Sequence, residues 1–294
     1  MINLLLSILS STGIFVVFKL LDRYHISNFP VIVYNYLFAA LLGFILNSIP
    51  VSLDAAFQSN WTSIAILIGI LFIIMFHIIG LSSQKAGISV TTVASKLSVV
   101  TPIVFSIIYD PVDTLTTLKV TGIIVAFAAV LLTIYKPGAF SVIKGTFYLP
   151  VILFLGMGIV DSLVKYAQHE FVSDHQLAFF SAILFSMAFF SGLITLIFRK
   201  KRFLVLFNLK TLLWGAILGA CNFGSIYFFI KALNYKSTVD EGFDSSVVFG
   251  VNNTGIVVLS VLTGLFIFNE KLRKVNWIGI ILAIIAIVIF SYTR

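Results

Sequence analysis

Long runs of apolar residues, separated by short polar connections, recur along the whole chain. About 20 residues suffice for a membrane-spanning helix, because each residue adds about 1.5 Å and the hydrocarbon core is about 30 Å thick. The runs of this kind are Asn3–Leu21, Phe29–Asn47, Trp61–Leu81, Ile88–Tyr109, Leu118–Tyr135, Phe147–Gln168, Gln176–Phe198, Thr211–Leu233, Ser245–Phe268 and Val275–Tyr292. The pattern predicts ten spans with no soluble domain between them.

The run Ile88–Tyr109 is unusual because polar residues continue through its middle. Ser89, Thr92 and Lys96 follow one another at helical spacing and share one face. A charge at this depth costs about 2.5 kcal/mol or more, so Lys96 should face a cavity or a partner rather than lipid. Pro102 has no backbone N–H, and we expect a bend because it frees the carbonyl four residues earlier.

An internal repeat relates the two halves of the chain. A shift of 157 positions superimposes Gly122 on Gly279, Asp113 on Glu270, Ser89 on Ser246 and Lys96 on Asn253. Because five spans per unit is an odd number, the two units must enter the membrane in opposite orientations. The predicted fold is an all-α multi-pass membrane protein. Its ten transmembrane helices form two inverted five-helix repeats, residues 1–140 and 141–294, around a central cavity.

Composition supports a membrane protein and limits the partners. The 294 residues are 60% hydrophobic and 10% charged, whereas a soluble domain has about 25% charged residues. The net charge of +8 lies in short loops, where basic residues contact lipid headgroups, so nucleic acid is not an expected partner. We expect the bilayer and a small-molecule substrate as partners, in a bacterial inner (plasma) membrane; a homodimer is left open.

Lys96 and Asn253 are the sharpest candidates for substrate binding. Lys96 could neutralise a carboxylate or phosphate, and its alternative role is an internal ion pair with Asp161. Asn253 could orient a polar ligand, or it could form an interhelical hydrogen bond. Thr92 and Ser246 complete the polar faces on these two spans.

Other polar residues within the spans have weaker signals. Asp161 could carry a proton, although a static pair with Lys165 is the simpler interpretation because the acid precedes the base by four residues. His77 could titrate near neutral pH, but a lone histidine on an apolar helix usually packs. The other polar residues singled out are Asn35 and Asn222, which could line the cavity, and Lys19, which should extend to the interface.

Two glycines predict a close helix contact. Gly215 and Gly219 lie four apart, a spacing that lets helix backbones approach in a membrane. Enzyme motifs are missing from the sequence: it has no Gly-x-Ser-x-Gly elbow, zinc motif or phosphate-binding loop. We therefore predict no catalytic residue, no metal site and no cofactor.

The stretch from Ser246 to Ser291 resembles the two closing helices of an EamA-type domain. The matching features are a helix, a short loop with Glu270, and a final helix led by Gly279; Asp113 and Gly122 occupy these places in the first half. The resemblance covers essentially the whole chain and implies the drug/metabolite transporter superfamily. It further implies a small metabolite, such as an amino acid or a related compound, carried by alternating access, with export as the direction. A carrier of phosphorylated or lipid-linked compounds, a scaffold and an intramembrane enzyme are the alternatives.

Charge and resemblance disagree on the orientation in the membrane. Basic residues gather in the odd-numbered connections, which the positive-inside rule places in the cytoplasm with both termini outside. The resemblance implies both termini inside. We take the charge pattern as the prediction because both halves share it.

Overall fold

Helices make up all the regular structure in the computed structural model, which describes residues 2–46, 62–101, 103–104, 116–134, 148–171, 177–198, 204–233 and 245–292. Within these ranges lie ten α-helices and one short 3-10 helix: α1 (Ile2–Arg23), α2 (Asn28–Ile45), α4 (Thr62–Lys85), α5 (Ile88–Leu97), α7 (Thr117–Ile134), α8 (Tyr148–Phe171), α9 (Leu177–Ile197), η3 (Leu204–Phe207), α11 (Leu209–Leu233), α12 (Ser245–Phe266) and α13 (Lys274–Ser291). These ranges contain no strand, and the predicted all-helical class is confirmed.

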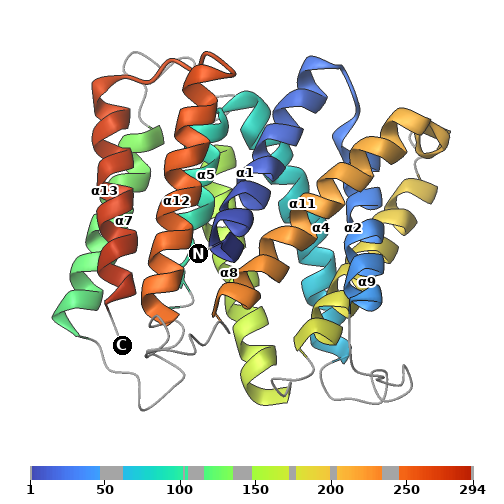
Figure 1. Cartoon of the computed structure of the whole chain (residues 1–294), viewed down its shortest axis with the longest axis horizontal. Helices are drawn as coiled ribbons and strands as arrows, with labels where there is room; N and C mark the ends of the chain where they lie inside the picture. Colours follow the sequence, from blue (N-terminus) through green and yellow to red (C-terminus); the bar gives the residue numbers. More distant parts are fainter. Residues whose placement is uncertain are drawn as a thin grey trace.

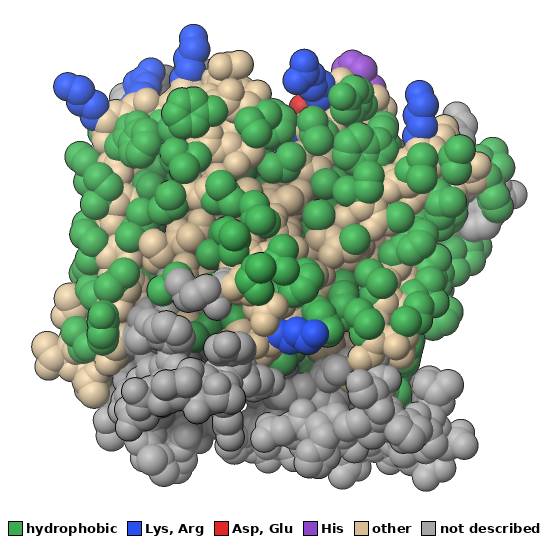
Figure 2. All heavy atoms as spheres, in the orientation of Figure 1, with side chains coloured by type: hydrophobic (Ala, Val, Ile, Leu, Met, Phe, Trp, Pro, Cys, Tyr) green, Lys and Arg blue, Asp and Glu red, His purple; other side chains and the backbone are tan. Residues whose placement is uncertain are grey.

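Five of the helices are long and apolar enough to cross a membrane. They are α1, α2, α4, α9 and α11, whose apolar stretches have 18 to 24 residues; α7, α8, α12 and α13 contain shorter apolar stretches. Hydrophobic side chains also cover much of the described surface on the face seen in Figure 2. An exterior of this kind would be unfavourable in water and suits a lipid environment. The structure therefore indicates a membrane protein.

Helices from the two halves of the chain pack against each other throughout. α7 packs on α13 on one side of the molecule, and α2 packs on both α9 and α11 on the other (Figure 1). Between these groups, α1 contacts α11 and α12, while α8 contacts α4 and α5. The contacts between the halves are therefore more extensive than those within either half.

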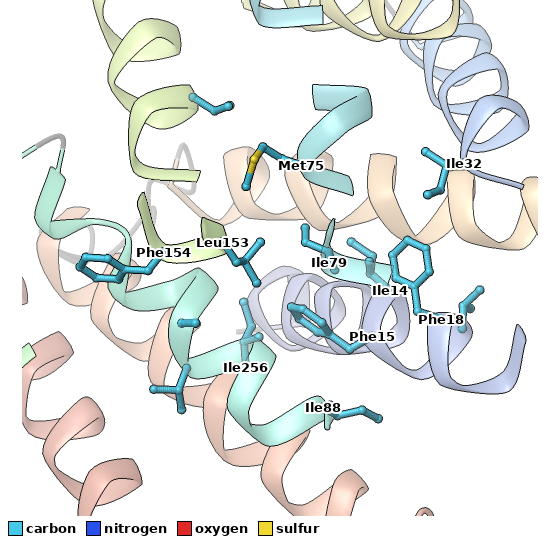
Figure 3. Close-up of a cluster of buried hydrophobic side chains, with 14 of the residues drawn as sticks. Ile14, Phe15, Phe18, Ile32, Met75, Ile79, Ile88, Leu153, Phe154 and Ile256 are labelled. Carbon is cyan, nitrogen blue, oxygen red and sulfur yellow. The ribbon is translucent and has the colours of Figure 1, made fainter. Parts of the chain in front are cut away.

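The apolar core lies where α1 meets α4, α5, α8 and α12 (Figure 3). Phe18 of α1 has no exposed surface and packs edge-on against Phe76 of α4, with ring centroids 5.8 Å apart. Ile88, Leu153 and Ile256 bring α5, α8 and α12 into the same cluster (Figure 3). Since both halves contribute to this core, neither half buries its apolar surface alone.

Glycines permit a close helix contact between α11 and α2. A Cβ atom on Gly219 would lie 2.7 Å from Cβ of Phe38 and 2.8 Å from the carbonyl oxygen of Asn35. A Cβ atom on Gly215 would collide with Cβ of Tyr34. The predicted close packing at these two glycines is confirmed.

The helix that carries Lys96 is shorter than the sequence suggests. We predicted one span from Ile88 to Tyr109, but α5 ends at Leu97. Just beyond it, the N–H of Thr101 donates to the carbonyl of Ser98 at 2.9 Å, three residues back instead of four. The sequence accounts for this change, because Pro102 has no N–H to occupy that carbonyl. Residues 105–115 lie outside the described part of the chain.

Basic side chains gather at one end of the molecule, uppermost in Figure 2. The connections between α1 and α2, α4 and α5, η3 and α11, and α12 and α13 all lie at this end (Figure 1). The exposed basic residues that they or the adjoining helix ends supply are Arg23, Lys85, Lys210, Lys271, Arg273 and Lys274. We refer to this end as the basic end.

Candidate functional site

The interface between α5 and α8 brings Lys96 and Asp161 into one region. Gly158 of α8 lies against Thr101 and the carbonyl of Ser98. α8 therefore approaches the backbone that directly follows the end of α5. Asp161 follows Gly158 by three residues and therefore lies on nearly the same face. Its carboxylate oxygen Oδ2 is 3.3 Å from Oγ of Ser98. A lysine predicted to bind substrate and a candidate proton carrier thus become neighbours.

Lys96 and Asp161 carry opposite charges that interact without direct contact. Each experiences the charge of the other, and in the described part of the chain no direct ion pair joins them. Lys96 is half-buried and Asp161 is exposed. Lys96 lies eight residues into α5, about 12 Å along its axis, and Asp161 lies thirteen residues into α8, about 20 Å. Lys96 is thus the last residue but one of α5, whereas Asp161 lies near the middle of α8.

Asp161 is exposed but does not belong to the apolar surface of α8. At about 100° per residue, Asp161 is rotated about 120° from the apolar surface of α8. Its neighbours Val160 and Ser162 are buried. The exposed apolar surface of α8 comprises Tyr148, Ile152, Leu155 and Ile159. Asp161 therefore exposes its carboxylate on a different side of α8 from these apolar residues.

Ser98 connects the end of α5 to Asp161 of α8. Its hydroxyl donates to the carbonyl of Ser95 at 2.6 Å and also lies within donating distance of Oδ2 of Asp161, at 3.3 Å. Because the hydroxyl has one hydrogen, the carbonyl and carboxylate oxygens compete for it. The predicted pair with Lys165 is not tested, since the side chain of Lys165 lies outside the described atoms.

Three buried hydroxyl groups lie on the helices that surround this region. Thr92 of α5, Ser260 of α12 and Thr12 of α1 are all nearly inaccessible, and their oxygens have no hydrogen-bond partner within the described residues. In contrast, the hydroxyls of Thr133 and Thr263 donate to carbonyls four residues back. A buried polar group without a partner costs about 1–3 kcal/mol. Each of these three hydroxyls carries that cost in the described structure.

The polar face predicted on α12 is described only in part. Asn253 is half-buried, and α12 packs against α5. No hydrogen bond between Asn253 and Lys96 is found among the described residues. Ser246 belongs to α12, but its side chain lies outside the described atoms. The roles predicted for Asn253 and Ser246 stay predictions.

Asn35 and Asn222 meet each other at a different place, between α2 and α11. The terminal atom of the Asn35 amide lies 3.2 Å from the carbonyl oxygen of Leu218, so it must be the NH₂ group, which donates to that carbonyl. The same atom lies 3.2 Å from Nδ2 of Asn222. Both residues are buried. This arrangement favours a polar contact between helices over a direct role in substrate binding.

His77 lies apart from the charged pair. Its ring packs edge-on against Phe29, with ring centroids 5.5 Å apart. This contact agrees with the packing role that we considered the usual one for a lone histidine in an apolar helix. The proton-carrier role of His77 stays a prediction, and Asp161 is the stronger candidate for it.

One polar cluster was missed by sequence reasoning. Glu270, from the connection between α12 and α13, accepts hydrogen bonds at the start of α5 and lies 3.8 Å from the ammonium group of Lys19. Lys19 also donates to the carbonyls of Ser83 and Gln84, and the prediction that it extends to the membrane interface stays a prediction. The repeat placed Glu270 opposite Asp113, but nothing in the sequence indicated its contact 182 residues away.

Comparison with known proteins adds a relative of unknown activity. No protein-family model matches the chain. An uncharacterized protein of Haemophilus influenzae is 29% identical over 297 residues, which cover 99% of this chain and 97% of that protein. The chain is therefore similar to a protein of nearly the same length, whose substrate and activity are not stated.

Proposed function

We propose that the protein is a secondary transporter for a small polar metabolite, an amino acid or a related compound, and that it exports this compound. The observation that carries the proposal is the pair of opposite charges, Lys96 of α5 and Asp161 of α8, which lie without a direct ion pair on two packed helices that the proposal counts as membrane spans. Charged residues within membrane spans are costly and typically mark the path of a substrate or an ion.

The proposal includes ten membrane spans arranged as two inverted five-helix repeats, residues 1–140 and 141–294. α5 and α12 begin at residues 88 and 245, and α7 and α13 begin at residues 117 and 274, so both pairs are 157 residues apart. The helix contacts are also repeated. α2 contacts α11 as α9 contacts α4, and α1 contacts α12 as α8 contacts α5. This correspondence supports two equivalent units that enclose a site near the midplane.

The two charges favour a zwitterionic substrate. Lys96 can bind a carboxylate, and Asp161 can bind an ammonium group, so one amino acid can satisfy both side chains at once. A phosphorylated or lipid-linked anion is the alternative, because Lys96 would also bind a phosphate. Its additional negative charges would be repelled by Asp161, so we favour the amino acid.

Asp161 also supplies a mechanism for coupled export. The carboxyl group can bind either the ammonium group of the substrate or a proton. If the two compete, a proton entering the cell displaces the substrate on its way out. The sequence has no ATP-binding motif, and an ion gradient can provide the free energy. The halves would rock around the site so that it opens to one side at a time.

The resemblance to the EamA-type branch of the drug/metabolite transporter superfamily supports the same function.

Transport assays with purified protein in sealed vesicles test the proposed function. We expect labelled amino acid to accumulate inside the vesicles chemically unchanged. A scaffold would accumulate nothing, and an enzyme would convert the compound; either result would contradict the proposal.

A further inference from the structure

The carboxylate of Glu270 binds the first turn of α5. Its Oε1 accepts a hydrogen bond from the N–H of Ile88 at 2.6 Å. Its Oε2 accepts hydrogen bonds from the N–H of Ser89 at 3.2 Å and from Oγ of Ser89 at 3.0 Å. The first N–H groups of a helix have no partner within the helix and carry partial positive charge, so a carboxylate stabilises them. Glu270 therefore provides the N-terminal cap of the helix that carries Lys96.

Two glycines leave room for this carboxylate. Gly87 precedes α5 with φ of 104°, a conformation that other residues rarely adopt, and a Cβ atom there would lie 2.9 Å from Oε1 of Glu270. A Cβ atom on Gly264 would lie 2.6 Å from Oε2. The carboxylate thus fits into a cradle formed by segments from both halves of the chain.

Lys19 extends the contact to α1 and α4. Its Nζ lies 3.8 Å from Oε1 of Glu270 and donates to the carbonyls of Ser83 and Gln84 at 3.3 Å each. Gln84 in turn donates to the carbonyl of Phe18 at 3.0 Å. One carboxylate from the second half thereby joins three helices of the first half, all at the basic end.

We propose that Glu270 is a latch that holds the two halves together at the basic end, and that the protein opens there by releasing it. The inference rests on the proposed function, because rocking of the halves requires their contacts to break at one end at a time. All the partners of the carboxylate lie in the first half, while its backbone belongs to the second. Release of Glu270 would leave its carboxylate and the N–H groups of Ile88 and Ser89 without these hydrogen bonds. Water can solvate all of them once the basic end opens.

The latch also connects the basic end to the substrate site. α5 begins at the Glu270 contact and reaches Lys96 eight residues later without interruption. A shift of the capped end would therefore move Lys96 with it. In this role Glu270 is a positioning residue that acts on Lys96 through the helix.

Distance measurements between spin labels test the latch without any substrate. The labels replace Lys85, in the first half, and Lys271, in the second, both exposed at the basic end; Cys221→Ser removes the native thiol. We expect one short distance in the parent protein. Glu270→Gln should raise the ratio of long to short distances about tenfold, which corresponds to about 1.4 kcal/mol.

Asp22→Asn is the matched control, since it removes an exposed carboxylate at the same end. It should leave the distances unchanged. If Glu270→Gln does not yield folded protein, Ser89→Ala removes one hydrogen bond and should shift the ratio in the same direction by less. A folded Glu270→Gln protein with unchanged distances would overturn the latch, even if its thermal stability fell. The distance measurement needs no transport. It therefore tests the latch separately from the transport assays that test the proposed function.

Discussion

At the scale of single residues, the proposed function depends on Lys96 and Asp161. The spacing of Ser89, Thr92 and Lys96 was enough to predict a polar face within a span. The contact of Ser98 with Asp161 could not be predicted, because it depends on how α8 meets the end of α5, 63 residues away in sequence. Charge and helical periodicity identify candidates, whereas tertiary packing decides which of them meet.

Removing the charge of Lys96 should abolish transport without harming the fold. Lys96→Ala takes an expensive charge out of the membrane, and no direct ion pair with Asp161 would be lost in the described structure. We expect unchanged thermal stability and no transport. The double variant Lys96→Ala with Asp161→Ala should be no more stable than the single one. Recovery of stability in the double variant would show a structural ion pair, and normal transport by Lys96→Ala would exclude binding.

Asp161→Asn should uncouple transport from the proton gradient and weaken substrate binding. The amide keeps the shape of the side chain but can neither release a proton nor pair with an ammonium group. A hydrogen bond to a charged group contributes about 1.5–3 kcal/mol, so the apparent KM should rise about tenfold to a hundredfold. Uptake at a series of substrate concentrations, with and without a pH gradient, measures both effects. Gradient-driven accumulation by the variant would argue against proton binding at Asp161.

At the scale of helices, apolar length predicted the positions of most elements but not the end of α5. The sequence indicated a break near Pro102, and the hydrogen bonding does change at Ser98. The end of α5 at Leu97 was not predicted. The apolar run continues to Tyr109, and hydropathy alone does not indicate where a helix ends within such a run. Gly215 and Gly219 were more informative, since their spacing correctly indicated a close contact.

Gly215→Ala should destabilise the contact between α11 and α2. The new methyl group would collide with Cβ of Tyr34, which a change of side-chain rotamer cannot move. Overpacking of this kind costs about 1–3 kcal/mol, so the melting temperature should fall. Gly224→Ala on the same helix is the control, because its methyl group would meet the hydroxyl of Ser10, which can rotate away. Equal losses in the two variants would contradict this account of the packing.

At the scale of the whole molecule, the distribution of basic residues makes a prediction about orientation. The described basic end contains Arg23, Lys85, Lys210 and the segment Lys271–Lys274, and the positive-inside rule assigns it to the cytoplasm. Single cysteines from Lys210→Cys and Tyr292→Cys, each with Cys221→Ser, can be labelled in intact cells. We expect an impermeant reagent to modify position 292 and not position 210. The reverse pattern would support the orientation that the family resemblance implies.

The central claim is that a zwitterion binds between Lys96 and Asp161 and crosses the membrane. Counterflow into vesicles that contain the purified protein tests it most directly, using an amino acid, its N-acetyl derivative and its amide. The derivatives lack the cationic and the anionic group, respectively, so each can satisfy one of the two charges. We predict accumulation of the amino acid alone. Equal accumulation of all three compounds, or none by a folded protein across the common amino acids, would contradict the account.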